Sequence, residues 1–317
     1  MSLERQLDAV GIAVAQGEVT AVESAGDHLT GVRLADDTMI ALDAVVVVPS
    51  ATPARGLAQS GASVLMVARD RARGAEVAAK IRSTGAPGSV ELLIADLACQ
   101  SDVTALAGQI RQGHDRLDVV IYNAGAGNTT RRVTADGIEA TLAVNHLAPF
   151  LLTILLAPLM QATPSSRVVT VSSYMHTRVK DTPWDDLQAE RDYSAAATCN
   201  LTKLLNVLFT YELARRWAAT SVSANALHPG WPLKTNLGRE QTGPGAVFDR
   251  VTKLIGSSAV KGVRTSLYLA GSPDVTATTG QYFSRRGPAK SSALTHNTNA
   301  AERLWEHSAE LCGLPTS

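Results

Sequence analysis

Residues 167–203 read RVVTVSSYMHTRVKDTPWDDLQAERDYSAAATCNLTK and hold the most informative pattern in the chain. Residues 168–171 form a short run rich in β-branched residues, which is typical of a buried strand. Ser172 and Ser173 follow directly, where that strand should end. Because ligands of open α/β sheets bind at the carboxyl ends of the strands, one of these serines is predicted to lie in a functional site.

The residues after this strand predict a helix. Apolar side chains recur mostly at three- and four-residue spacing, at Leu201, Leu204, Leu205, Leu208 and Ala214. Such spacing gives a helix one apolar face. Cys199 and Lys203 are four residues apart, so they are predicted to share a face of the same helix.

The strand with its two serines, and the segment LTKLLNVLFTYELARR at residues 201–216, resemble the short-chain dehydrogenases/reductases, and the retinol-dehydrogenase-like branch in particular. The resemblance spans residues 56–314 and implies a Rossmann-like, doubly wound parallel α/β sheet. In that family a Tyr-x-x-x-Lys helix follows the serine. Here the lysine is present as Lys203, but Cys199 stands where the family has tyrosine.

The overall composition narrows the function classes. The chain has 317 residues, of which 45% are hydrophobic, and 29 basic residues balance 29 acidic ones. A balanced charge without a basic face does not favour nucleic-acid binding. The three cysteines, Cys99, Cys199 and Cys312, are too few and too dispersed for a disulfide framework, so a reducing compartment is expected. No pattern predicts a metal site.

The sequence also favours a cytoplasmic protein without a membrane partner. The first eight residues are charged rather than apolar, which is unlike a signal peptide. The longest apolar run, residues 142–160, contains Asn145, His146 and two prolines. We therefore expect a buried helix there rather than a membrane span.

Residues 1–43 differ in pattern from residues 44–317, which we predict to be the Rossmann domain. Strand-like runs at residues 17–24 and 29–34 alternate with turn residues, so a β-hairpin appendage is expected. Residues 1–48 resemble the β-meander of thioredoxin-reductase-like flavoproteins. They contain no glycine-rich flavin motif, so we do not infer a flavin.

The first parallel strand is predicted at residues 45–48, and a dinucleotide-binding protein needs a glycine-rich turn after it. Glycines let the backbone approach the pyrophosphate, which then lies at the N-terminus of the next helix. The related dehydrogenases carry Thr-Gly-x-x-x-Gly-x-Gly, whereas this chain reads PSATPARG at residues 49–56 and keeps only Gly56. The sequence therefore favours a protein that requires no cofactor, with NADP as the alternative.

If NADP binds, the resemblance implies which residues contact it: Arg69, Asp96, Asn123, Gly125 and Thr235. Arg69 would suit the 2′-phosphate and Asp96 the adenine, although the first could be a strand-end charge and the second a helix cap. Asn123 and Gly125 belong to the family's Asn-Ala-Gly signature beside the ribose, and Thr235 corresponds to a contact with the nicotinamide. Residues 236–262 fit a substrate lid.

Five side chains are candidates for the chemistry: Ser173, Lys203, Asn145, Cys199 and Tyr193. In the family the tyrosine hydroxyl transfers the proton, the lysine lowers its pKa, the serine orients the carbonyl and the asparagine holds a water near the lysine. Cys199 reaches roughly 4 Å less far than a tyrosine oxygen would. It could act through a water, act as a nucleophile or base, or fill space only. Tyr193 could supply a phenol in its place.

Three functions remain open at this point. The loss of both the glycine loop and the tyrosine favours a redox-neutral step on a small, largely apolar metabolite, such as cyclisation, dehydration or isomerisation. The alternative is an NADP(H)-dependent carbonyl reductase or alcohol dehydrogenase with a remodelled phosphate loop, and the third is a non-catalytic binding protein. In the family the helices that hold Asn145 and Lys203 pack against a second subunit, so the resemblance implies a homodimer or homotetramer.

Overall fold

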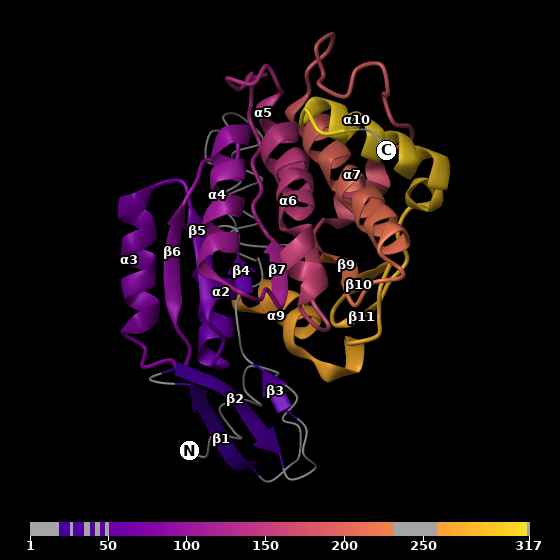
Figure 1. Cartoon of the computed structure of the whole chain (residues 1–317). Helices are drawn as coiled ribbons and strands as arrows, with labels where there is room; N and C mark the ends of the chain where they lie inside the picture. The colour runs from indigo at the N-terminus through magenta and orange to yellow at the C-terminus, as the bar shows by residue number, and fades with distance from the viewer. Residues whose placement is uncertain are drawn as a thin grey trace.

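A computed structural model describes residues 19–25, 28–34, 39–41, 45–47, 51–230 and 259–315. At its centre is an eight-stranded sheet with the order β11-β10-β9-β8-β7-β4-β5-β6 (Figure 1). The strands are β4 (Val45–Val47), β5 (Val64–Ala68), β6 (Val90–Ile94), β7 (Val119–Tyr122), β8 (Arg167–Val171), β9 (Ser223–His228), β10 (Gln281–Ser284) and β11 (Gly287–Pro288). Neighbouring strands are parallel except for β10 and β11. The predicted doubly wound α/β fold is therefore confirmed.

Helices cover both faces of this sheet. One face carries α2 (Ala51–Gln59), α3 (Arg71–Arg82) and α9 (Ala259–Gly271). The other carries α4 (Gln100–Gly113), the continuous α5 (Ala140–Leu142), η1 (Ala143–Leu147) and α6 (Ala148–Ala162), and α7 (Ala195–Arg216). The last helix, α10 (Thr298–Leu311), packs on α7. Short helical turns are η2 (Tyr174–Arg178), η3 (Pro273–Val275) and η4 (Ala293–His296).

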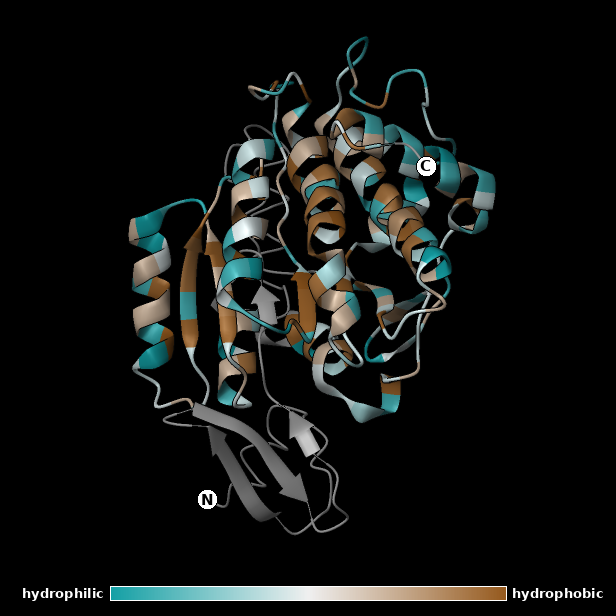
Figure 2. Cartoon of the chain, viewed as in Figure 1, coloured by the Kyte–Doolittle hydropathy of each residue, from teal (hydrophilic) through white to brown (hydrophobic). Residues whose placement is uncertain are grey.

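The two faces are built by alternation along the strands. In β7, Val120 and Tyr122 belong to the apolar cluster under α4, α6 and α7, whereas Val119 and Ile121 belong to the cluster under α2, α3 and α9. Successive side chains of a strand point to opposite faces, so a strand covered on both faces must be apolar throughout. Figure 2 shows β5 and β7 largely in brown, among helices that carry both brown and teal residues.

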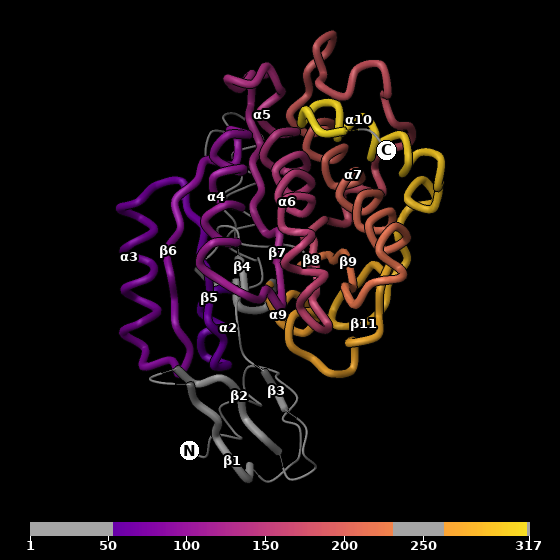
Figure 3. The backbone as a smooth tube through the Cα atoms, viewed as in Figure 1, coloured from indigo at the N-terminus to yellow at the C-terminus, as the bar shows by residue number. Residues whose placement is uncertain are grey.

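The strand order reverses at β4 and β7, which lie next to each other at the centre of the sheet (Figure 3). The chain adds β5 and β6 beyond β4, and β8, β9 and β10 beyond β7. In open sheets of this kind, ligands bind at the carboxyl ends of the strands beside such a reversal of strand order. The candidate residues after β5, β6, β7 and β8 all lie at that edge.

Strands β1 (Val19–Ala25), β2 (His28–Leu34) and β3 (Met39–Ala41) form a separate antiparallel sheet. The predicted hairpin strands near the N-terminus are therefore confirmed, and β4 is the first parallel strand of the main sheet. The division into an appendage over residues 1–43 and a Rossmann domain over residues 44–317 stays a prediction.

One helical segment, Ala140–Ala162, is long and apolar enough by composition to cross a membrane. However, 67% of its most apolar window is buried inside the protein. It packs against α4 on one side and against the sheet beneath. The segment has the surroundings of a core helix, which is how residues 142–160 were interpreted from the sequence.

Candidate active site

The two serines after β8 have different surroundings. Ser172 is 2% exposed, and its hydroxyl donates to the Lys203 carbonyl at 2.7 Å, so it fastens β8 to α7. Ser173 is half-buried, and its hydroxyl oxygen accepts from the Met175 backbone N–H at 3.2 Å. Its hydroxyl proton can therefore still donate to a bound molecule. Of the pair, Ser173 has the geometry of a functional residue.

Lys203 brings a charge to the same place. It is 9% exposed, and its ammonium donates to the Val171 carbonyl at 3.1 Å, beside the end of β8. Burial lowers the pKa of this ammonium, and the nearby Cys199 sulfur opposes the shift. Because an ammonium has three N–H donors, the bond to Val171 leaves donors for a substrate oxygen or a water.

Cys199 lies one helical turn before Lys203, is half-buried, and forms no disulfide. Tyr193 lies near it, but its hydroxyl donates to the Asn128 carbonyl at 2.8 Å. Burial raises the pKa of the Tyr193 phenol. A phenol that is already bonded and is harder to ionise is poorly placed to transfer a proton near neutral pH. In this structure Tyr193 does not replace the missing tyrosine.

Asn145 lies in η1, a π-helical turn inside the long apolar helix, and such turns are frequent at functional sites. Its Oδ1 accepts from the Ala126 N–H at 2.6 Å, and its Nδ2 donates to the Ala126 carbonyl at 3.0 Å and to the Thr202 hydroxyl at 3.1 Å. Both amide hydrogens are therefore used within the protein. Asn145 connects the loop after β7 to α7, and the water-holding role that the resemblance implied stays a prediction.

Thr202 is a member of this network that the sequence did not reveal. It accepts from Asn145, and its own hydroxyl donates to the Cys199 carbonyl at 2.8 Å. It thus links the π-helical turn to the turn of α7 that carries Cys199. A threonine within an apolar helix has no local sequence signal for such a role, because the role depends on a partner 57 positions away.

His176 holds the backbone of Ser173 through a hydrogen bond. Its Nδ1 lies 2.6 Å from the Ser173 carbonyl, and its Nε2 accepts from the Ser292 N–H at 3.1 Å. The ring therefore carries its hydrogen on Nδ1, and burial lowers its pKa. Both nitrogens are occupied, so His176 is not available as a metal ligand. Among the described residues no group of three or more His, Cys, Asp or Glu side chains is arranged to hold a metal ion.

Two of the predicted NADP contacts lie at the ends of β5 and β6. Arg69 is exposed directly after β5. Asp96, after β6, accepts from the Ala98 N–H at 3.0 Å through one carboxylate oxygen. The N-cap position of α4 is Cys99, so the alternative that Asp96 caps this helix is wrong. Arg69 and the second oxygen of Asp96 remain suitable partners for a phosphate and an adenine.

The other predicted contacts divide between the loop after β7 and a segment outside the described residues. Asn123 is partly buried and Gly125 is exposed in the loop that Asn145 holds through Ala126. Thr235 lies outside the described residues. So does the predicted lid, except for residues 259–262, which form the start of α9.

Gly56 serves helix packing rather than a phosphate cradle. A Cβ atom at this position would lie 2.7 Å from Leu267 Cδ1, so the missing side chain lets α2 approach α9. Three positions separate the last residue of β4 from the first of α2, and the N–H groups at the start of α2 remain a general anion site. The residues present therefore fit the adenosine end of a dinucleotide, while the glycine cradle for its pyrophosphate is absent from α2.

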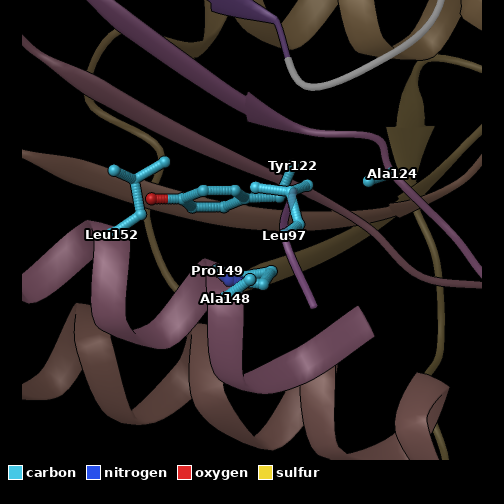
Figure 4. A pocket seen from close by; sticks show the side chains of 6 residues that line it. All are labelled: Leu97, Tyr122, Ala124, Ala148, Pro149 and Leu152. Atoms are coloured by element: carbon cyan, nitrogen blue, oxygen red, sulfur yellow. The ribbon is translucent and has the colours of Figure 1, made fainter. Parts of the chain in front are cut away.

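Below the loops after β6 and β7 lies a small apolar pocket (Figure 4). It is lined by Leu97, Tyr122, Ala124, Ala148, Pro149 and Leu152. The Tyr122 hydroxyl is bonded to the Thr153 hydroxyl at 2.7 Å, and burial raises the pKa of this phenol. The pocket therefore offers no polar group for chemistry, and its lining packs against the loops that follow β6 and β7.

Comparison with known proteins tests the resemblance to the short-chain dehydrogenases. Residues 51–243 match the family described as short chain dehydrogenase. This chain belongs to the short-chain dehydrogenase family. Human retinol dehydrogenase 14 is 39% identical over 277 residues, and the match covers 81% of each chain. A Streptomyces sp. (strain C5) protein named as a daunorubicin C-13 ketoreductase is 35% identical over 261 residues, with 82% of this chain and 87% of that one covered.

Solved structures of similar fold lead to the same family. An uncharacterised protein from Mycobacterium paratuberculosis has a TM-score of 0.68 and 29% identity, covering 86% of this chain and 94% of its own. A structure from Beutenbergia cavernae, described as an NAD(P)-dependent gluconate 5-dehydrogenase with bound NADP, has a TM-score of 0.60 and 26% identity, covering 76% and 94%. The resemblance to retinol dehydrogenases is thus confirmed, whereas that of residues 1–48 to flavoproteins stays a prediction.

Proposed function

We propose that this chain is an NADP(H)-dependent oxidoreductase that interconverts the carbonyl and alcohol forms of a small, largely apolar metabolite. Lys203 is the observation that carries the proposal. Lys203 is buried one helical turn after Cys199, and its ammonium donates to the carbonyl of Val171, two residues before Ser173. Burying a charge with so little compensation destabilises a fold, and perturbed buried charges gather at functional sites.

The named relatives support the same reaction class. The human protein is called a retinol dehydrogenase and the Streptomyces protein a ketoreductase. Both names describe the interconversion of an alcohol and a carbonyl group. This support moves the reductase ahead of the redox-neutral enzyme that the sequence alone favoured.

NADP would be held at its adenosine end by Arg69, Asp96 and Asn123, and when bound it would supply or accept the hydride. Ser173 would donate its hydroxyl proton to the substrate oxygen. The Lys203 ammonium would stabilise negative charge that develops on that oxygen. Because the Cys199 sulfur stops roughly 4 Å short of a tyrosine oxygen, the transferred proton would pass through a water between Cys199 and the substrate.

A redox-neutral step is the second candidate, and the position of Tyr193 favours it. With its hydroxyl bonded to Asn128 and its pKa raised, Tyr193 is poorly placed to take over proton transfer beside Lys203. Cys199 and Lys203 could then remove a proton next to a carbonyl group, leading to dehydration or isomerisation without hydride transfer. Product of unchanged mass, or lighter by one water, formed without NADPH would identify this function.

Binding of nicotinamide cofactors tests the first proposal. The pure protein is titrated with NADPH and NADH by fluorescence, together with Arg69→Ala and, as a matched control, Arg73→Ala. Arg73 is an exposed arginine paired with Asp70 on the nearby helix α3. A charge-assisted bond to a phosphate contributes about 1.5–3 kcal/mol, so Arg69→Ala should weaken NADPH binding at least roughly tenfold. NADH binding and the Arg73→Ala control should stay unchanged.

Failure to bind either cofactor, or an Arg69→Ala variant with undiminished NADPH affinity, would contradict the proposal. Absence of both cofactor binding and turnover would instead leave the non-catalytic binding protein. A cytoplasmic location is part of the proposal, because the apolar helix Ala140–Ala162 is covered within the chain.

A further inference from the structure

The strands β8, β9 and β10 are neighbours, and their carboxyl ends extend the edge that holds the candidate active site (Figure 1). Backbone pairing aligns Val171, Leu227 and Phe283 in one row across these strands. Ser173 and Arg285 each come two residues after that row. Because neighbouring strands lie about 4.8 Å apart, the backbones at these two positions are separated by roughly 10 Å. One bound molecule of modest length can therefore reach both residues.

The segments at this part of the edge are basic. Residues 171–180, 223–230 and 281–291 contain the ends of β8, β9 and β10, and they include no aspartate or glutamate. Their lysines and arginines, all exposed, are Arg178, Lys180, Arg285, Arg286 and Lys290. Basic and acidic residues are equal in number over the whole chain, so positive charge is concentrated here. Such a concentration attracts anionic ligands.

Two of these arginines occupy a turn that suits other residues. Arg285 and Arg286 form the two-residue loop between β10 and β11, where Ser284 pairs with Gly287. Their φ angles are 52° and 68°. Two-residue hairpin loops with positive φ favour asparagine and glycine, because a Cβ atom strains this conformation. Folding alone does not favour arginine here, and strained residues gather at ligand-binding sites.

His228 lies between Ser173 and Arg285 and adds a hydrogen-bond donor. Its Nδ1 accepts from the Tyr174 backbone N–H at 3.3 Å. The ring hydrogen is therefore on Nε2, which can donate to a ligand. Burial lowers the pKa of His228, and His176 and the nearby Arg285 guanidinium lower it further. Arg285 forms no ion pair with an acidic side chain in the described part of the chain, so its guanidinium is available to a ligand.

We propose that Arg285 and His228 bind a carboxylate at the far end of a substrate whose carbonyl lies at Ser173. This inference rests on the proposed interconversion of carbonyl and alcohol, and it adds the class of substrate: an aldehyde or ketone with an apolar chain that ends in a carboxylate. A guanidinium offers a planar pair of N–H donors that matches a carboxylate. Tyr174, which follows Ser173 and is 62% exposed, gives the apolar chain a surface to pack on.

The test compares a medium-chain ω-oxo carboxylic acid with its methyl ester, which has the same carbon chain without the charge. For the wild type, kcat/KM with NADPH should be about fivefold higher for the acid, the size expected of a well-aligned ion pair at an exposed site. Raising the salt concentration should reduce this ratio. Arg285→Asn should abolish the preference for the acid. Arg111→Asn, which removes an exposed arginine from the last turn of α4 at the opposite edge of the sheet, should keep it.

The choice of asparagine separates ligand binding from folding. Asparagine adopts positive φ more readily than arginine does, so Arg285→Asn should have a Tm equal to or above that of the wild type. A residue that only supported the fold would lower Tm when replaced. Loss of the acid preference at an unchanged or raised Tm is therefore the signature of a ligand-binding arginine.

Direct binding distinguishes this inference from the proposed function. The acid is titrated into the protein by calorimetry with oxidised NADP present, so that no carbonyl is reduced. Its affinity should be about fivefold lower for Arg285→Asn than for the wild type. Acid that binds through Arg285 but is not reduced with NADPH would remove the proposed function and leave the anion site. Undetectable acid binding, equal kcat/KM for acid and ester in the wild type, or equal acid affinity of the wild type and Arg285→Asn would overturn the inference.

Discussion

Replacing Cys199 with tyrosine should restore the proton donor that the family uses and raise the rate of carbonyl reduction. Cys199 is half-buried on the first part of α7, outside the apolar clusters, so a larger side chain there does not enter a packed core. The new phenol would extend roughly 4 Å beyond the present sulfur. Lys203, one turn later, would lower the pKa of that phenol through its positive charge.

The expected gain follows from what a positioned proton donor contributes. General acid catalysis is worth about 10²–10⁴ in rate. The supporting residues are already in place, since Lys203 is held at Val171 and Ser173 remains able to donate. The phenol itself has not been positioned by its surroundings, so we expect the lower end, about a hundredfold in kcat/KM. This corresponds to about 2.7 kcal/mol of transition-state stabilisation.

The assay follows NADPH oxidation by absorbance with a panel of apolar aldehydes and ketones. Cys199→Phe is the control, because it adds the same ring without the hydroxyl. NADPH affinity and Tm are measured for all three proteins, so that a change in kcat/KM is separated from changes in cofactor binding or folding. Equal rates for Cys199→Tyr and Cys199→Phe, with equal NADPH affinity, would refute the reasoning, because the hydroxyl would then contribute nothing beside Lys203.

Three further predictions concern stability. Gly56→Ala should change the free energy of unfolding in urea by less than about 1 kcal/mol, because the Leu267 side chain that its Cβ meets can shift and alanine is favoured over glycine inside a helix by about 1 kcal/mol; lost NADPH binding at unchanged stability would instead make Gly56 a cofactor residue. Burial lowers the pKa of His146 to about 4 in the folded state. As the pH falls below about 6.5, the unfolded state therefore takes up a proton that the folded state does not. Between pH 7 and pH 4 the free energy of unfolding of the wild type should fall by roughly 3 kcal/mol more than that of His146→Asn. Lys203 has a lowered pKa in the folded state. Below that pKa its positive charge lowers the free energy of unfolding, and above the unfolded-state pKa of about 10.4 this destabilisation is gone, because the side chain is neutral in both states. Lys203→Met should therefore raise Tm at pH 7 and lose this advantage at high pH, and a lower Tm at pH 7 would contradict it.

The sheet and its helices could be predicted because their signals are local. Strands covered on both faces read as apolar runs, and β8 begins one residue before the run predicted at residues 168–171 and ends with it. The serines, Asn123 and Lys203 could also be placed at one edge, because the carboxyl ends of parallel strands coincide. These inferences need only periodicity and the order of strands along the chain.

The surroundings of the site could not be predicted in the same way, because they depend on contacts between distant segments. Nothing local distinguishes Ser172 from Ser173, yet only the first meets the Lys203 carbonyl. Similarly, Asn145 finds its partners only when the loop after β7 folds back onto η1.

The interpretation of the site rests on whether the Lys203 ammonium serves folding or chemistry, and the structure allows the two to be separated. The Ser172 hydroxyl bonds to the backbone carbonyl of Lys203. This tie between β8 and α7 therefore survives any substitution of the lysine side chain. Lys203→Met removes the ammonium that donates to Val171, and it leaves the bond from Ser172 to the backbone carbonyl in place. A variant that is as stable as the wild type but inactive would leave chemistry as the reason for the buried charge, whereas a variant that is active would remove the central observation behind the proposed function.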